Sequence, residues 1–266
     1  MALTANKSNR LFSCSSIIVL LVLMSLISSA SAKEESSSLK EMLAVSDSLY
    51  SEYLLTKQPE CIIKSYNILM ACDATYENCY SIKWRLSRTI NEYGWHVDNS
   101  VNTWRQGLSL AKEAIELEPN NYEGYLWCGI LHGQIGRAVG FLNALSSVKQ
   151  MRDCLEKVVE IEPKHAYARY ILSLLYRQVP SSPLSFGNKT KALELAQSAV
   201  FLEPESPNLW WGLYEAQIAA GKRQKARETL EIIVEMPEYD PFNHLYNQPH
   251  PSEIKEKAEF ALSRYK

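Results

Sequence analysis

The residues of this chain best suited to chemistry are its histidines and cysteines, and their spacing matches no common catalytic motif. His244 and His250 are close enough in sequence to share a metal ion, and His132 lies in an apolar segment. Patterns typical of zinc proteases, serine hydrolases, Walker nucleotide-binding loops and zinc ribbons are missing from the sequence. We therefore expect that the protein is not an enzyme and that it binds no metal ion and no cofactor. Catalysis by His132 or by the His244 and His250 segment is the alternative.

Residues 1–32 have the pattern of a secretory signal peptide. Two basic residues and no acidic one precede the apolar run Ile17–Met24, and an Ala-Ser-Ala sequence ends at Ala32. The apolar run is about half of the roughly 20 residues that span a bilayer, so a permanent anchor is the less favoured interpretation. We expect export to a periplasm or a secretory pathway, with no stable membrane span after cleavage. Asn188-Lys189-Thr190 is then a glycan acceptor sequence if the host is eukaryotic.

Five cysteines follow the predicted cleavage site, and an odd number leaves at least one thiol without an intramolecular partner. In an oxidising compartment Cys72–Cys79 and Cys61–Cys79 are both possible pairings. Cys128 and Cys154 lie in apolar helical patterns and are expected to be small core residues.

Composition excludes several other classes of protein. The chain has 266 residues, 46% of them hydrophobic, which is enough for a sizeable core. Without residues 1–32 it has 26 basic and 30 acidic residues, a net charge of −4, so charge gives no reason to expect nucleic-acid binding. Only 10 glycines argue against a turn-rich all-β fold or a glycine-rich phosphate site.

The elements that must position any functional residue are helices in a repeat. Four similar acidic-proline phrases end at Pro119, Pro163, Pro204 and Pro237, with spacings of 44, 41 and 33 residues. Each follows apolar residues at helical spacing, and proline disfavours helical backbone in the residue before it. Recurrence at this spacing predicts an array of helical hairpins.

The repeat resembles the tetratricopeptide repeat (TPR) family. The match is clearest in the last repeat, at Trp210, Leu213, Gly221, Ala226, Leu230 and Pro237. The resemblance implies an all-α, right-handed superhelical solenoid with an N-terminal helical hairpin and a C-terminal capping helix. The expected parts are the helical segment 33–79, repeats at about 80–121, 122–165, 166–206 and 207–238 within 80–240, and a loop and capping helix at 241–266.

Two more specific relatives share features with the chain. Trp84-Arg85-Leu86-Ser87-Arg88 resembles a segment of the regulator-of-microtubule-dynamics group. The export signal and repeat layout resemble the periplasmic T-component of TRAP-type transporters, for which the implied partner is a solute-binding protein.

The TPR resemblance also implies a concave groove lined by the first helix of each hairpin. The family's groove positions, transferred one by one onto this chain, are Glu123, Leu126, Ile130, Tyr167, Tyr170, Leu174, Arg177, Asn208, Trp211, Glu215 and Ile218. Aromatic rings beside an arginine can hold an extended acidic or C-terminal peptide segment. The preferred function is therefore a non-catalytic scaffold for a protein or peptide partner. The alternative is that Tyr170 and Trp211 only pack between adjacent hairpins.

Two repeats are longer than the usual 34 residues, and the excess falls at 136–142 and 180–187. Both segments are expected to project from the same edge of the solenoid. Their apolar residues include Phe141, Leu142, Leu184 and Phe186, which need to be covered by each other, by a second subunit in a homo-oligomer, or by a ligand. This edge supports the alternative of a transporter accessory that binds or passes a small apolar or acidic ligand.

We predict that the mature protein begins at Lys33, because the apolar run is short and the cleavage pattern ends at Ala32. N-terminal sequencing of the secreted or periplasmic fraction should read from Lys33. An intact Met1 on protein recovered from the membrane fraction would contradict this prediction.

Overall fold

The computed structural model describes residues 37–97, 100–237 and 249–265, apart from the side chains of 141–145. The chain divides into two compact units, residues 1–44 and 45–266. In the first unit the described residues, 37–44, are helical. In the second, the described residues form helices joined by short connections, and they include no strand beyond an isolated bridge between Ser181 and Gly187.

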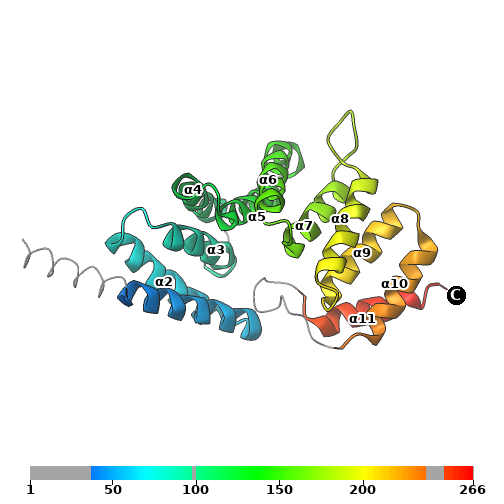
Figure 1. Cartoon of the computed structure of the whole chain (residues 1–266), viewed down its shortest axis with the longest axis horizontal. Coiled ribbons are helices and arrows are strands. Elements are labelled where there is room, and N and C mark those ends of the chain that lie inside the picture. The colour runs from blue at the N-terminus through cyan, green and yellow to red at the C-terminus, as the bar shows by residue number, and fades with distance from the viewer. Residues whose placement is uncertain (1–36, 98–99, 238–248, 266) are drawn as a thin grey trace, which may run out of the picture. The chain divides into compact units, whose positions relative to one another are not determined.

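The helices of the second unit follow one another as hairpins (Figure 1). Residues 45–56 are helical and are followed by α2 (Pro59–Thr75). The remaining helices are α3 (Tyr80–His96), α4 (Val101–Leu117), α5 (Tyr122–Val139), α6 (Phe141–Ile161), α7 (Ala166–Gln178), α8 (Lys189–Leu202), α9 (Pro207–Ala219), α10 (Arg223–Glu235) and α11 (Pro251–Leu262). The helices of each pair, α3 with α4 through α9 with α10, pack on each other, and α4, α6 and α8 pack on the next pair.

The repeated prolines mark helix ends, as the sequence predicts. The helices α4, α6, α8 and α10 each end two residues before a proline of the repeated phrase. Side chains cap the N-termini of several helices. Ser206 accepts a hydrogen bond from the Leu209 amide, and Asn188 accepts one from the Lys191 amide. Start and stop signals in the sequence therefore set the helix boundaries.

Small residues let the two helices of a hairpin approach closely. Ala226 and Ala192 are fully buried in such contacts. At Gly129 a Cβ atom would lie 2.9 Å from Leu155, so the α5–α6 contact has no room for a side chain at this position. The apolar stripe of each helix is covered by its partner helix and by the next hairpin, which yields a series of linked core clusters.

The first long repeat does not contain a projecting loop, which corrects the expectation for residues 136–142. The excess residues are helical: α5 continues to Val139 and α6 begins at Phe141, so these helices have 18 and 21 residues. By comparison, α7 to α10 have 13 or 14 residues. The side chains of Phe141 and Leu142 lie outside the described part of the structure.

The second long repeat does contain a loop, between α7 and α8. Leu184 is 80% exposed there, as expected for a projecting segment. Phe186 instead folds back: its ring lies 5.5 Å from the ring of Tyr176, and the guanidinium of Arg152 lies 4.4 Å from its centroid. The chain itself therefore covers much of Phe186, and this residue needs no second subunit or ligand for that purpose.

The last described helix closes the end of the array. Ile254 and Ala258 of α11 are buried against Leu230 and Ile233 of α10. The C-terminal helix thus hides an apolar surface that would otherwise face water. Within the ranges that the structure describes, no helix is both long and apolar enough to cross a bilayer.

We predict that Ala226→Leu lowers the free energy of unfolding by about 1–3 kcal/mol, because the larger side chain overpacks a fully buried helix contact. The control Lys222→Leu, at an exposed position one turn away, should change it by no more than about 0.5 kcal/mol. Urea titration measures both variants. Equal stability of the two variants and the wild type would show that Ala226 is not at a tight contact.

We also predict that His165 makes the fold sensitive to acid. This buried residue caps α7 by accepting a hydrogen bond from the Ala168 amide. Burial lowers its pKa from 6.5 to about 4, and Glu162 offsets this only in part. Between these two values the unfolded chain binds a proton that the folded chain does not, so stability falls as the pH is lowered from 6.5 towards 4, by up to about 3 kcal/mol.

Urea unfolding at several pH values across this window measures the effect. The matched variant His165→Ser retains a capping oxygen but has no titrating ring. It should lose less stability than the wild type over the same range. An identical loss in both proteins would assign the acid sensitivity to other groups.

Candidate functional site

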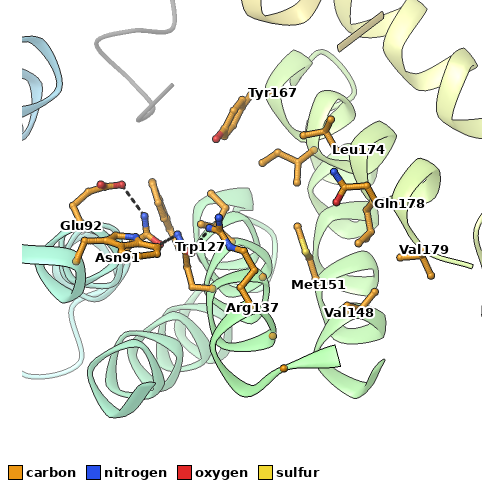
Figure 2. A pocket seen from close by; sticks show the side chains of 18 of the residues that line it. Asn91, Glu92, Trp127, Arg137, Val148, Met151, Tyr167, Leu174, Gln178 and Val179 are labelled. Atoms are coloured by element: carbon orange, nitrogen blue, oxygen red, sulfur yellow. Dashed lines mark hydrogen bonds between the residues drawn. The ribbon is translucent and has the colours of Figure 1, made fainter. Parts of the chain in front are cut away.

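A half-open cavity of about 770 Å³ lies among α3, α5, α6 and α7. In Figure 2, Asn91 and Glu92 of α3 lie on one side of it, and Leu174 and Gln178 of α7 lie on the other. The apolar part of its lining includes Trp95, Trp127, Ile130, Val148, Met151, Tyr167, Ile171, Leu174 and Leu175. The volume suits a small molecule or a few side chains of a bound peptide.

One face of α5 supplies the middle of the cavity wall. Trp127, Ile130, Gln134 and Arg137 follow each other at intervals of three or four residues, which places them along the same helix face. Gly133 lies on this face, opposite the Met151 sulfur of α6. The helical extension of the repeat, from Gly136 onward, therefore forms part of the wall instead of projecting away from it.

A chain of hydrogen bonds runs along the polar side of the cavity. The Glu92 carboxylate, 2% exposed, accepts from the Tyr53 hydroxyl at 3.1 Å and from the Asn91 amide at 2.7 Å. Gln134 donates to the Asn91 side-chain oxygen at 3.0 Å, and Arg137 donates to the Gln134 side-chain oxygen. These donors compensate the desolvation of the buried carboxylate and connect α3 to α5.

Tyr53 holds the other end of this network. Burial raises its pKa, and the neighbouring Glu92 carboxylate raises it further, so the hydroxyl stays protonated and can donate. The Tyr53 oxygen is also 2.8 Å from Nε2 of His96. The first helical hairpin thus helps to fix the position of the α3 residues that face the cavity.

The mouth of the cavity carries an exposed cation beside an exposed aromatic ring. Arg137 is exposed, and its guanidinium carbon lies 5.8 Å from the ring centroid of Trp95, which is itself 44% exposed. Such a pair can stack on a planar group and attract a carboxylate. The cavity therefore combines an apolar interior with a positive group at its rim.

The structure places only some of the sequence-predicted groove residues in this cavity. Tyr167, Leu174 and Ile130 line it. Tyr170 instead packs between hairpins, because its ring fills the space beside Gly212 of α9, where a Cβ would lie 2.6 Å from the ring. Leu126 is buried in the core, in the cluster that contains Leu155 and Leu172.

The predicted groove residues nearer the C-terminus are occupied by contacts within the protein. Arg177 and Glu215 form an ion pair of 2.8 Å that joins α7 to α9. Asn208 is buried and donates to the Pro249 carbonyl at 3.1 Å. Trp211 packs beside Tyr214 against the cluster formed by α10 and α11. Asn208 and Trp211 therefore lie outside the cavity, in contacts with the C-terminal segment and with α10.

The remaining candidates lie elsewhere. Glu123 accepts a hydrogen bond from the Tyr80 hydroxyl at 2.6 Å. His132 is buried, and His250 caps α11 by accepting from the Ser252 amide. His244 lies outside the described residues. Among the described residues no group of three or more histidine, cysteine or acidic side chains could hold a metal ion.

Sequence reasoning missed the most distinctive lining residues, Trp95, Trp127, Arg137 and Met151. The helical spacing of Trp127 and Arg137 on α5 was a usable signal. The excess length of the repeat obscures this signal, because it predicts a projecting segment at 136–142 where the structure has helix. No comparable signal places Trp95 of α3 near Arg137, since that proximity depends on how two hairpins pack.

The arrangement of helices is that of a TPR-type solenoid, and comparison with solved structures supports this class. A TPR protein of Thermus thermophilus is 16% identical, with a TM-score of 0.62, covering 84% of this chain and 98% of that chain. Residues 41 to the end of MamA from Desulfovibrio magneticus are 18% identical, with a TM-score of 0.51, covering 73% and 94% of the two chains. At these identities the likeness concerns the fold alone.

The family is identified from the sequence. Residues 42–186, more than half of the chain, match the model of the family "Regulator of microtubule dynamics protein 1-3". The chain therefore belongs to this family. The matched range contains all the described residues that line the cavity. No curated protein matches the chain significantly.

Proposed function

We propose that this protein is a non-catalytic scaffold that binds an extended peptide segment of a protein partner in the cavity among α3, α5, α6 and α7. The observation that carries the proposal is the combination of an apolar, half-open cavity with the exposed Arg137 and Trp95 at its mouth. An apolar side chain of the peptide would enter between Trp127 and Leu174. Burying it there would supply most of the affinity.

The charge pattern favours a peptide with an acidic residue or a free carboxyl terminus beside the apolar anchor. Arg137 is the exposed cation among the described residues of the lining, whereas the Glu92 carboxylate is buried and already accepts two hydrogen bonds. A guanidinium at the rim can form a charge-assisted hydrogen bond with a carboxylate. A basic peptide gains no comparable partner there.

The family name supports a partner connected with microtubules. Export of the mature chain after cleavage at Ala32 is a separate proposal, which rests on the N-terminal sequence. The two proposals lead to different partners, because a chain inside the secretory pathway does not meet microtubules. Co-sedimentation of the purified protein with microtubules, combined with the identity of its N-terminus in cells, separates them.

A small apolar or acidic ligand is the second candidate, favoured by the volume of about 770 Å³. This is the role of a solute-transporter accessory. Mass spectrometry of the purified protein under native conditions tests it. A stoichiometric small molecule that leaves on denaturation supports the small-ligand role.

We predict that the double variant Trp95→Ala and Arg137→Ala weakens peptide binding roughly tenfold or more. Loss of the stacking ring and the rim cation removes about 1–3 kcal/mol of binding free energy. The measurement is binding of the purified protein to an array of extended peptides in which acidic residues and free carboxyl termini are varied. Circular dichroism should be unchanged, because both side chains are exposed.

The chain offers a matched control in a second exposed cation–aromatic pair. On the C-terminal segment, Arg264 lies 4.3 Å from the ring centroid of Phe260, and that ring is 62% exposed. The double variant Phe260→Ala and Arg264→Ala should bind peptides as the wild type does. Equal binding by the cavity variant, or selective loss in the control variant, would contradict the proposed site.

A further inference from the structure

Two cysteines of the same hairpin lie in direct contact. The sulfur of Cys128 on α5 and the sulfur of Cys154 on α6 are 2.8 Å apart, and both are free thiols. Cys128 is 3% exposed and Cys154 is half-buried. They are 26 residues apart in sequence, so only the packing of the two helices brings them together.

The surrounding core holds the two sulfurs in place. Cys128 belongs to the cluster of Trp104, Trp127 and Leu131, and Cys154 packs against the same cluster. One residue further along each helix, Gly129 meets Leu155 without room for a side chain. Since this contact fixes the separation of the helices, the sulfurs remain neighbours in the folded protein.

The local electrostatics suit thiol chemistry. The thiol of Cys154 lowers the pKa of Cys128 by hydrogen bonding to its sulfur, and His132, one turn further along α5, lowers it in addition. The same interaction, together with burial, raises the pKa of Cys154. The pair therefore shares one proton more readily than it holds two, and the thiolate is the reactive form in disulfide exchange.

We propose that Cys128 and Cys154 are a site of disulfide formation and that the bond ties α5 to α6. The sulfurs need to approach by less than about 1 Å to reach a bond length near 2.05 Å. The oxidant is a low-molecular-weight disulfide of the glutathione class. The proton shared by the pair first moves to the Cys128 sulfur. The Cys154 thiolate, the more accessible of the two, then attacks one sulfur of the oxidant, and one thiolate leaves.

The Cys128 thiolate then attacks the Cys154 sulfur and expels the second thiolate. The two protons lost by the cysteines are taken up by the two departing thiolates. The protein thus gives up two electrons, and the oxidant is reduced to two thiols.

The disulfide would restrain one wall of the cavity. Trp127 precedes Cys128 on α5 and lines the cavity, and Met151 lies one turn before Cys154 on α6. Among the other described cysteines, Cys61, Cys72 and Cys79, none is joined in a disulfide. Neither of the pairings considered for them from the sequence is formed in the structure.

Thiol mapping of the purified protein tests the proposal. The protein is equilibrated with mixtures of reduced and oxidised glutathione, its free thiols are alkylated, and it is digested without reduction for mass spectrometry. We expect the peptide containing Cys128 to be linked to the peptide containing Cys154, with two thiols fewer than in the reduced protein. Dithiothreitol should reverse the link.

Two single variants distinguish the two steps. Cys128→Ser should accumulate a glutathione adduct on Cys154, because the resolving sulfur is missing. Cys154→Ser should leave Cys128 unmodified, since that sulfur is buried. The control Cys61→Ser should still lose two thiols. The proposal is overturned if wild-type Cys128 and Cys154 both remain alkylatable at the most oxidising ratio, or if they link only to other cysteines.

Discussion

Close contact between paired helices is the interaction on which the rest of this structure depends. Each helix has an apolar stripe that it cannot hide alone, so it must lie against its hairpin partner and against the next hairpin. Ala192 and Ala226 permit that approach in the later repeats, and Gly129 permits it between α5 and α6. The same α5–α6 contact brings two sulfurs together and leaves the neighbouring Trp127 in the cavity wall.

The cavity arises where the array departs from a regular repeat. The helices α5 and α6 are longer than those that follow, and Met151 of α6 lies against Gly133 of α5. Their extra length supplies the wall that carries Arg137. A buried carboxylate, Glu92, is tolerated beside this wall because Tyr53 and Asn91 donate to it. The greater length of α5 and α6 thus creates the candidate cavity.

The C-terminal part of the array is closed by contacts within the chain. The ion pair of Arg177 with Glu215 uses two side chains that a peptide could otherwise contact. Trp211 and Tyr214 pack, partly buried, against the cluster formed by α10 and α11. An array without such a cap would leave an apolar end exposed to water. The cap and the candidate cavity therefore occupy different parts of the chain, with the cavity nearer the N-terminal hairpins.

The sequence by itself determined the repeat, the ends of the helices at Pro119, Pro163 and Pro204, and the TPR-type fold. These features depend on local backbone preferences and on apolar spacing, which can be seen along a single chain. Only the tertiary structure decided that Trp95 lies near Arg137, that Trp211 packs against the cluster of α10 and α11, and that Cys128 contacts Cys154. Each of these contacts joins residues from different helices, and their proximity depends on hairpin packing angles that no local pattern encodes.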